Sequence, residues 1–354
     1  YTNIPLTYYL DHELTHALAN SLIPEEGESN SVLAEGLATW ATGGHYGPEP
    51  IHALAAALPA MGRYVPLERL LSDFRAEQHE IAYIQSASFV GWLVERDGLD
   101  TVKAFYGAAN DPERFFNAGY PELEAEWLQW LEQEWGRDVA HHRAWWEAQI
   151  RFFDTMRRYE ERLDSFAREL PDSPEGWSLA QRLQYSENVD TPLAIALESH
   201  LIEASEQLVC NDDPTSTLTL LDEVLETVEE GNVAPGGTLA DRLAVAELLT
   251  LQDKALRQRQ SAAWMATAAP ALHPQVAWTL LDMARHGPLR QESVWVQPQG
   301  EQMVALVAWY PLRGGQGRAF HLTFTPHEEG WRVEQMRRLP ADHLIPRSER
   351  LCRS

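Results

Sequence analysis

The stretch Asp11-His12-Glu13-Leu14-Thr15-His16-Ala17-Leu18 places two imidazoles four residues apart, with a carboxylate directly after the first. On a helix, residues i and i+4 share a face, so the ring nitrogens of His12 and His16 can converge on one metal ion. Glu13 lies about 100° further round the helix, where its carboxylate can reach a water molecule beside that ion. The stretch therefore predicts a helix that carries two metal ligands.

The residues around this stretch predict an amphipathic helix. Apolar residues recur at helical spacing and predict a stripe that faces the core, with both histidines pointing away from it: Leu10, Leu14, Ala17, Leu18 and Leu22. Pro24 predicts the end of the helix, because a proline cannot continue the hydrogen-bond ladder. The alternative is that His12 and His16 are surface histidines with no metal, since a pattern of three fixed positions also recurs by chance.

A candidate third ligand lies in the next predicted helix, which begins at Ser31 with Ser31 or Asn30 as its N-cap and stops at Gly43-Gly44. This segment is apolar on nearly every side, so we expect it to be buried with one carboxylate, Glu35. An unpaired buried carboxylate costs several kcal/mol unless it is neutralised, paired or bound to a metal. Glu35 is therefore predicted to share a zinc ion with the two histidines, the alternative being that it faces solvent.

The spacing of these residues resembles that of a known group of enzymes. H-E-x-x-H is followed, after eighteen residues, by Glu35 in an Ala-Glu-Gly-Leu-Ala context. This is similar to the gluzincins, zinc peptidases with a glutamate as third ligand, and within them to the aminopeptidase N-like spacing and, more closely, to the bacterial peptidase MA-like family. Thermolysin shares His-Glu-Leu-Thr-His, but it has an aspartate four residues beyond its ligand glutamate, where this chain has Thr39. That departure argues against the thermolysin branch and leaves the partner of the histidines unidentified.

Three later blocks resemble the peptidase MA-like pattern, which covers about residues 1–135: 66–74, 83–93 and 122–128. In related enzymes a tyrosine at the start of the second block donates a hydrogen bond to the tetrahedral intermediate, and Tyr83 stands at the matching position. A neutral phenol aimed at a developing oxyanion in a dry site can contribute a few kcal/mol. The alternative is that Tyr83 only packs in a helix.

Bulk composition excludes several classes of function. The formal charge of −25, from 53 acidic and 28 basic residues, disfavours binding to nucleic acid or anionic lipid. Two cysteines, Cys210 and Cys352, make neither a disulfide framework nor a cysteine-based metal site. No apolar run is long enough to span a bilayer. Because the sequence begins at Tyr1, we expect a leader or membrane anchor upstream of it. We therefore expect an extracytoplasmic or membrane-anchored protein. Gluzincins also carry a substrate-binding sheet upstream of the zinc helix, and we expect that sheet in the same upstream region.

The chain is predicted to be mainly α with an α+β C-terminal domain, in three parts: a gluzincin-like catalytic domain (1–135), a helical connector (136–235) and a helix-plus-antiparallel-sheet domain (236–354). In the first part, we interpret His45, His52 and His79 as structural or solvated, because they lack metal spacing; His52 or His79 could still line a cleft. A helix from about Arg137 to Leu170 is expected to bury its aromatic stripe in a core.

The last hundred residues change from helical spacing to strand-like alternation. Strands are predicted at 293–297, 303–311, 319–325 and 330–335, with a turn at 298–300. Helices followed by such a sheet, which ends in Gly330-Trp331-Arg332-Val333, resemble the nuclear transport factor 2-like cone, whose pocket often binds a small molecule or a partner.

Together these features predict a zinc-dependent metallopeptidase that acts on peptide or protein substrates. His12, His16 and Glu35 would hold one catalytic Zn²⁺, Glu13 would be the general base, and Tyr83 would stabilise the oxyanion. The alternative is a binding or scaffold protein that uses its connector and C-terminal domain, with a vestigial zinc site. Substrate, cleavage specificity and oligomeric state are left open by the sequence.

Overall fold

The structure, a computed structural model, describes residues 6–21, 23, 27, 29–45, 49–109, 111–137, 139–163, 191–283, 287–312, 317–328 and 330–340. The chain divides into two compact units. The N-terminal unit contains Ile4–Ile150 with Asp212–Pro214, and the C-terminal unit contains Arg151–Asn211 and Thr215–Ser354.

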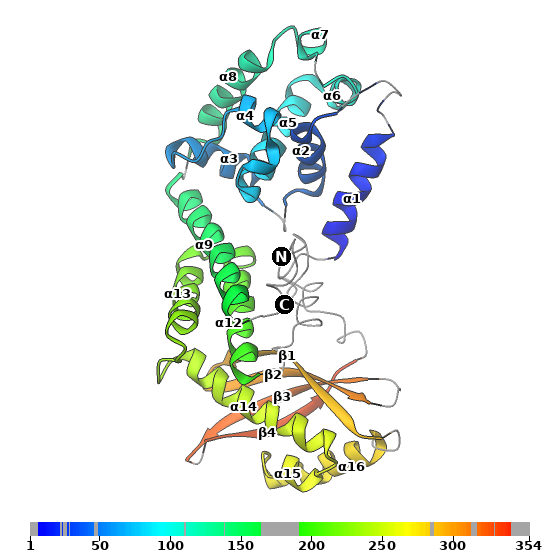
Figure 1. Cartoon of the computed structure of the whole chain (residues 1–354), viewed down its shortest axis with the longest axis vertical. Helices are drawn as coiled ribbons and strands as arrows, with labels where there is room; N and C mark the ends of the chain where they lie inside the picture. Colours follow the sequence, from blue (N-terminus) through cyan, green and yellow to red (C-terminus); the bar gives the residue numbers. More distant parts are fainter. Residues whose placement is uncertain are drawn as a thin grey trace. The chain divides into compact units, whose positions relative to one another are not determined.

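The described part of the N-terminal unit is helical (Figure 1). Its elements are α1 (Leu6–Asn20), α2 (Ser31–Thr42), α3 (Ile51–Ala60), α4 (Leu67–Ser72), the 3₁₀ turn η1 (Phe74–Ala76), α5 (His79–Asp97), α6 (Leu99–Tyr106), α7 (Pro112–Phe116), α8 (Tyr120–Trp130) and the π-helical turn η2 (Leu131–Trp135). Helix α9 (Val139–Leu163) begins in this unit and continues past Ile150.

Helix α1 forms where the sequence predicts it, but two of its expected features are wrong. The helix ends at Asn20, and a turn in which Ser21 donates to the carbonyl of Leu18 closes it, four residues before Pro24. The apolar stripe is exposed rather than buried: Leu10, Leu14 and Leu18 are 53%, 55% and 62% exposed. Helix α1 packs on α2 through the face that carries the two histidines, so the leucines, on the opposite side, point outward.

Helix α2 is buried and has both predicted caps. The side chain of Asn30 accepts from the backbone N–H of Leu33 at 2.9 Å, and Gly43 ends the helix in the left-handed conformation (φ 78°). Gly36 permits the close approach of α2 to α5, because a Cβ there would lie 2.6 Å from the carbonyl oxygen of Ser86. The backbone of α2 therefore lies directly against α5.

Helix α5 is fixed to the rest of the unit by a buried amide. Gln85 is fully buried, and its side chain exchanges hydrogen bonds with both backbone groups of Val65, accepting from the N–H at 3.0 Å and donating to the carbonyl oxygen. On α8, Glu124 accepts from the backbone N–H of Leu67 at 2.7 Å and from the hydroxyl of Tyr64. Gln85 and Glu124 thus connect the segment from Tyr64 to Leu67 to α5 and α8.

The C-terminal unit consists of helices followed by an antiparallel sheet (Figure 1). Its elements are α12 (Pro192–Val209), α13 (Pro214–Glu230), α14 (Thr238–Arg257), α15 (Ser261–Met265), the 3₁₀ turn η3 (Pro270–Leu272), α16 (His273–Met283), β1 (Leu289–Gln299), β2 (Gln302–Pro311), β3 (Arg318–His327) and β4 (Gly330–Arg338). The four described strands pair in the order β1-β2-β3-β4, all antiparallel. The predicted strands and the predicted turn near Gly300 (φ 65°) are confirmed.

One hydrophobic core joins the helices of this unit to its sheet. Fully buried residues from α14, α15 and α16 contact apolar strand residues, among them Val245, Trp264, Val276, Val307 and Phe320. The outer edge of β1 is covered by polar side chains: Ser199 accepts from the N–H of Val296 at 2.9 Å, and Arg242 donates to its carbonyl oxygen at 2.9 Å. This edge of the sheet is therefore not open at Val296.

The predicted fold class, mainly helical with an α+β C-terminal part, is confirmed at this level of detail. The aromatic stripe of α9 is buried as expected, with Trp146 fully buried and its indole donating to the carbonyl of Leu54 at 2.9 Å. The end of that predicted helix, residues 164–170, lies outside the described residues. Within the described residues, the helices are all too short or too polar to cross a membrane.

Candidate metal centre

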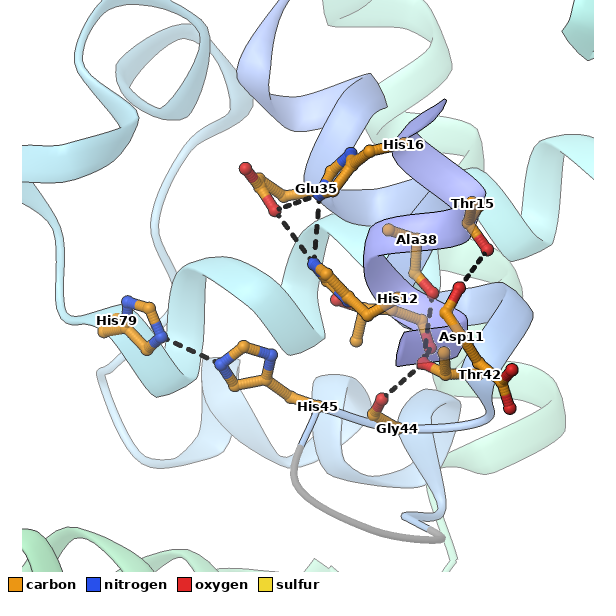
Figure 2. Close-up of polar contacts among 11 residues, drawn as sticks. Asp11, His12, Thr15, His16, Glu35, Ala38, Thr42, Gly44, His45 and His79 are labelled. Carbon is orange, nitrogen blue, oxygen red and sulfur yellow. Dashed lines mark hydrogen bonds and ion pairs between the residues drawn. The ribbon is translucent and has the colours of Figure 1, made fainter. Parts of the chain in front are cut away.

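Two neighbouring helices bring the three predicted ligands together (Figure 2). Helix α1 supplies His12 and His16, and α2 supplies Glu35. The Nε2 atoms of His12 and His16 lie 3.1 Å apart. The Oε2 atom of Glu35 lies 3.3 Å from Nε2 of His12 and 3.1 Å from Nε2 of His16. The three atoms therefore form a nearly equilateral triangle, although Glu35 is 23 positions from His12 in the sequence.

The triangle has the dimensions that a tetrahedral metal requires. Ligand atoms about 2.0–2.1 Å from a zinc ion at tetrahedral angles lie roughly 3.3 Å from one another. Two imidazole nitrogens and one carboxylate oxygen are also the donor set of catalytic zinc sites with one open position. Among the described residues, this is the group of histidine and acidic side chains that meets the distance requirement for a metal ion. The side chains of His12, His16 and Glu35 are 13%, 21% and 25% exposed, so the centre is mostly buried but still accessible to solvent.

The charges of these groups favour an ionised glutamate. Burial opposes ionisation of Glu35, but its hydrogen bonds with His12 and His16 outweigh that penalty and lower the pKa of the carboxyl to about 2. The hydrogen bond with Glu35 raises the pKa of His16 against the opposing effect of burial. Glu35 is therefore a carboxylate across the physiological range, which is the form that binds a metal.

Glu13 lies beside the triangle without belonging to it. Its side chain is exposed and makes no hydrogen bond or ion pair with the described residues. Its negative charge contributes to the raised pKa of His16, which places its carboxylate within electrostatic reach of the centre. The carboxylate of Glu13 is thus exposed beside the three candidate ligands.

Tyr83, from α5, lies next to the ligand His12, with 6.2 Å between the ring centroids. Two histidines that the sequence analysis interprets as structural or solvated, His45 and His79, lie at the same place. The Nε2 atoms of His45 and His79 are 2.8 Å apart, a hydrogen bond between residues 34 positions apart, and the ring of His45 is 6.1 Å from that of His12. Figure 2 shows His45 next to His12, with His79 beyond His45. The sequence contains only an indirect signal: His45 follows α2 closely, and His79 opens the helix of Tyr83.

His52, the third histidine interpreted as structural, belongs to a buried hydrogen-bond network. Its Nδ1 is 2.9 Å from Oγ of Ser88, which also accepts from the indole of Trp127 at 3.3 Å. Glu95 lies 3.5 Å from its Nε2. Although a serine, a histidine and a carboxylate meet here, Ser88 is fully buried and cannot reach a substrate. Burial lowers the pKa of His52 to about 4, so it is neutral at physiological pH.

Two buried hydroxyls lie on the helices around the centre. Thr39, one turn after Glu35, is fully buried, and its hydroxyl makes no hydrogen bond with the described residues. It stands where thermolysin has an aspartate, but it is not hydrogen-bonded to either of the two candidate histidine ligands. Tyr106 on α6 is likewise almost fully buried, with the side chain of Ser29 near its hydroxyl. Burial raises the pKa of Tyr106; the interaction with Ser29 opposes this in part, and the negative charge of Glu35 raises the pKa further. The phenol is therefore close enough to Glu35 to interact with it electrostatically.

Comparisons with known proteins leave the family of the chain open. No protein-family model, no curated protein and no solved structure matches it.

Proposed function

We propose that the protein is a zinc-dependent peptidase whose metal is held by His12, His16 and Glu35. The observation that supports this most directly is the triangle of ligand atoms, which are 3.1–3.3 Å apart. Two separate helices, α1 and α2, supply these atoms. Two histidines at i and i+4 meet by helix geometry alone, but the arrival of Glu35 requires the packing of α1 on α2.

A zinc ion in such a site supplies a Lewis acid that lowers the pKa of water and polarises a substrate carbonyl. The side chains of the protein supply the remaining chemistry. Glu13 accepts the proton of the attacking water and returns it to the nitrogen of the leaving amine, which keeps the proton balance of peptide hydrolysis. Tyr83 donates a hydrogen bond to the oxyanion that forms on the former carbonyl oxygen. The partial burial of the three ligands excludes part of the bulk water, which strengthens these interactions.

Metal analysis and one conservative variant test this proposal. We expect about one zinc per chain in the purified protein, because two histidines and a carboxylate with an open position form a high-affinity site. Glu13→Gln keeps the shape of the side chain but cannot accept a proton, so the variant should retain zinc and lose at least about 100-fold in hydrolysis of an unstructured protein such as casein. Absence of zinc from a folded protein would refute the proposal.

The comparison of these two proteins also tests the alternative of a binding or scaffold protein. If the wild type binds zinc but neither protein hydrolyses the substrate, the centre is structural or vestigial. Equal, measurable hydrolysis by both preparations would identify a contaminating protease. A zinc-loaded wild type that is active, beside a zinc-loaded variant that is not, supports the catalytic proposal.

A further inference from the structure

The ring of Tyr83 is enclosed by imidazoles. The ring centroid of Tyr83 lies 4.0 Å from that of His45 and 4.2 Å from that of His79, and the two imidazole centroids are 4.8 Å apart. These three rings form a closed triangle, which we call the Tyr83 cluster. Phe74 contacts the phenol from another direction at 5.3 Å, with the rings at 65°. A phenol with neighbours at these distances has little freedom to change its rotamer.

The hydrogen bond between the two imidazoles fixes the cluster. At 2.8 Å, one Nε2 donates its hydrogen and the other accepts it, so at least one of His45 and His79 is neutral. His45 follows the end of α2, and His79 is the first residue of α5. The hydrogen bond therefore joins two segments that α3, α4 and η1 separate along the chain. Neither imidazole can turn without breaking this bond. In support, burial and the neighbouring imidazoles keep the pKa of His45 well below its usual value, which favours its neutral form.

The Tyr83 cluster is next to the candidate metal centre. The ring of His12 lies 6.1 Å from that of His45 (Figure 2). It lies 6.2 Å from that of Tyr83, so two members of the cluster are next to one candidate ligand. A group that stabilises an oxyanion must be held in place before the reaction, because misplacement by about 1 Å can cost roughly 100-fold in rate.

We propose that His45 and His79 are positioning residues that hold Tyr83 beside His12, so that its hydroxyl is ready to donate to the oxyanion. This inference rests on the proposed function. The pair acts through Tyr83 and not on the substrate directly. Its loss should therefore lower kcat by about tenfold, while KM and zinc content stay unchanged.

A double-mutant cycle with His79→Ala and Tyr83→Phe tests the inference. If the pair acts through Tyr83, His79→Ala should lower kcat about tenfold in the wild type but less than about twofold in the Tyr83→Phe background. His79→Phe keeps a ring against Tyr83 without the hydrogen bond, so its kcat should fall between those of the wild type and His79→Ala. His141→Ala is the matched control, because this histidine on α9 is 43% exposed and pairs with Asp212; its kcat should change less than about twofold.

Three outcomes would overturn the inference. Equal losses in both backgrounds would show that His79 acts independently of Tyr83. Loss of zinc from a folded His79→Ala protein would show that the pair supports the metal ligand instead. Unchanged kcat would show that the pair is not needed.

A failure of the proposed function itself is distinguishable. It would appear as the absence of zinc-dependent hydrolysis in the wild type. In that case ¹³C-tyrosine-labelled protein, with the signal of Tyr83 identified by Tyr83→Phe, decides the positioning. A signal that moves in His79→Ala supports it, and a signal that does not move overturns it.

Discussion

Helices α1 and α2 both contribute ligands to the candidate metal centre, but the protein holds them in opposite ways. Helix α2 is capped at both ends, buries Val32, Leu33 and Ala38 almost completely, and lies against α5 at Gly36. Helix α1 exposes its leucines and meets α2 through the histidine face. One helix is fixed by apolar packing, and the other by the polar contacts that a metal would replace. Metal binding should therefore hold α1 on α2, with little effect on α2 itself.

The largest effect is expected from removing the ligand that both histidines contact. Glu35→Ala leaves His12 and His16 without their shared partner and removes one of three metal ligands, so zinc affinity should fall by roughly 1,000-fold, about 4 kcal/mol. Competition with a chromophoric chelator measures this. Glu68→Ala, an exposed glutamate on α4, is the control and should bind zinc as the wild type does. Wild-type zinc affinity in Glu35→Ala would show that α2 supplies no ligand to the centre.

A cavity in α2 should lower the free energy of unfolding more than a substitution of an exposed leucine of α1 does. Leu33 is 1% exposed and belongs to the face of α2 that packs into the unit. Leu33→Ala removes buried methyl groups and leaves a cavity, so the free energy of unfolding should fall by about 3 kcal/mol. Urea unfolding of the zinc-free protein measures this. A loss under about 1 kcal/mol would mean that α2 is not fixed by apolar packing.

The framework behind α2 should weaken in acid. The rings of His52 and of Trp40, the latter on α2, both lie against Gly91 of α5. Its folded pKa of about 4 is below the unfolded value of 6.5, so the unfolded chain takes up the proton first. The stability contributed by neutral His52 is complete above pH 6.5 and is lost as pH falls toward 4, by about 3 kcal/mol.

The difference between the wild type and His52→Gln isolates this contribution, because other titrating groups cancel. Unfolding at pH 7 and pH 4 should show the wild type more stable than the variant at pH 7, with most of that advantage gone at pH 4. Parallel pH curves for the two proteins would show that His52 does not titrate in this range.

The sequence predicts the parts of this molecule that depend on local pattern. Asn30 and Gly43 have the residue types and positions of helix caps, and the alternation from residue 293 onward specifies the strands. The convergence of His12 and His16 follows from helix geometry, and the approach of Glu35 was inferred from the cost of burying a carboxylate.

Two features could not be predicted, because both depend on packing between distant segments. Periodicity shows that Leu10, Leu14 and Leu18 share a face, but not whether another element covers that face. The contact between His45 and His79 exists because α2 lies close against α5. No local spacing encodes such a pair, so the sequence gives only the indirect signal that His45 follows α2 and that His79 begins the helix of Tyr83.

The smallest effect is expected on the exposed face of α1, and it tests the comparison most directly. Leu14 and Leu33 are the same residue type on the two ligand-bearing helices, but Leu14 is 55% exposed. Leu14→Gln keeps a good helix former and removes little buried area, so the free energy of unfolding should change by less than about 0.5 kcal/mol, with zinc affinity unchanged. A loss above about 1.5 kcal/mol would mean that this face is covered in solution. If that loss grows with protein concentration, the cover is a second copy of the chain, because only association makes stability depend on concentration.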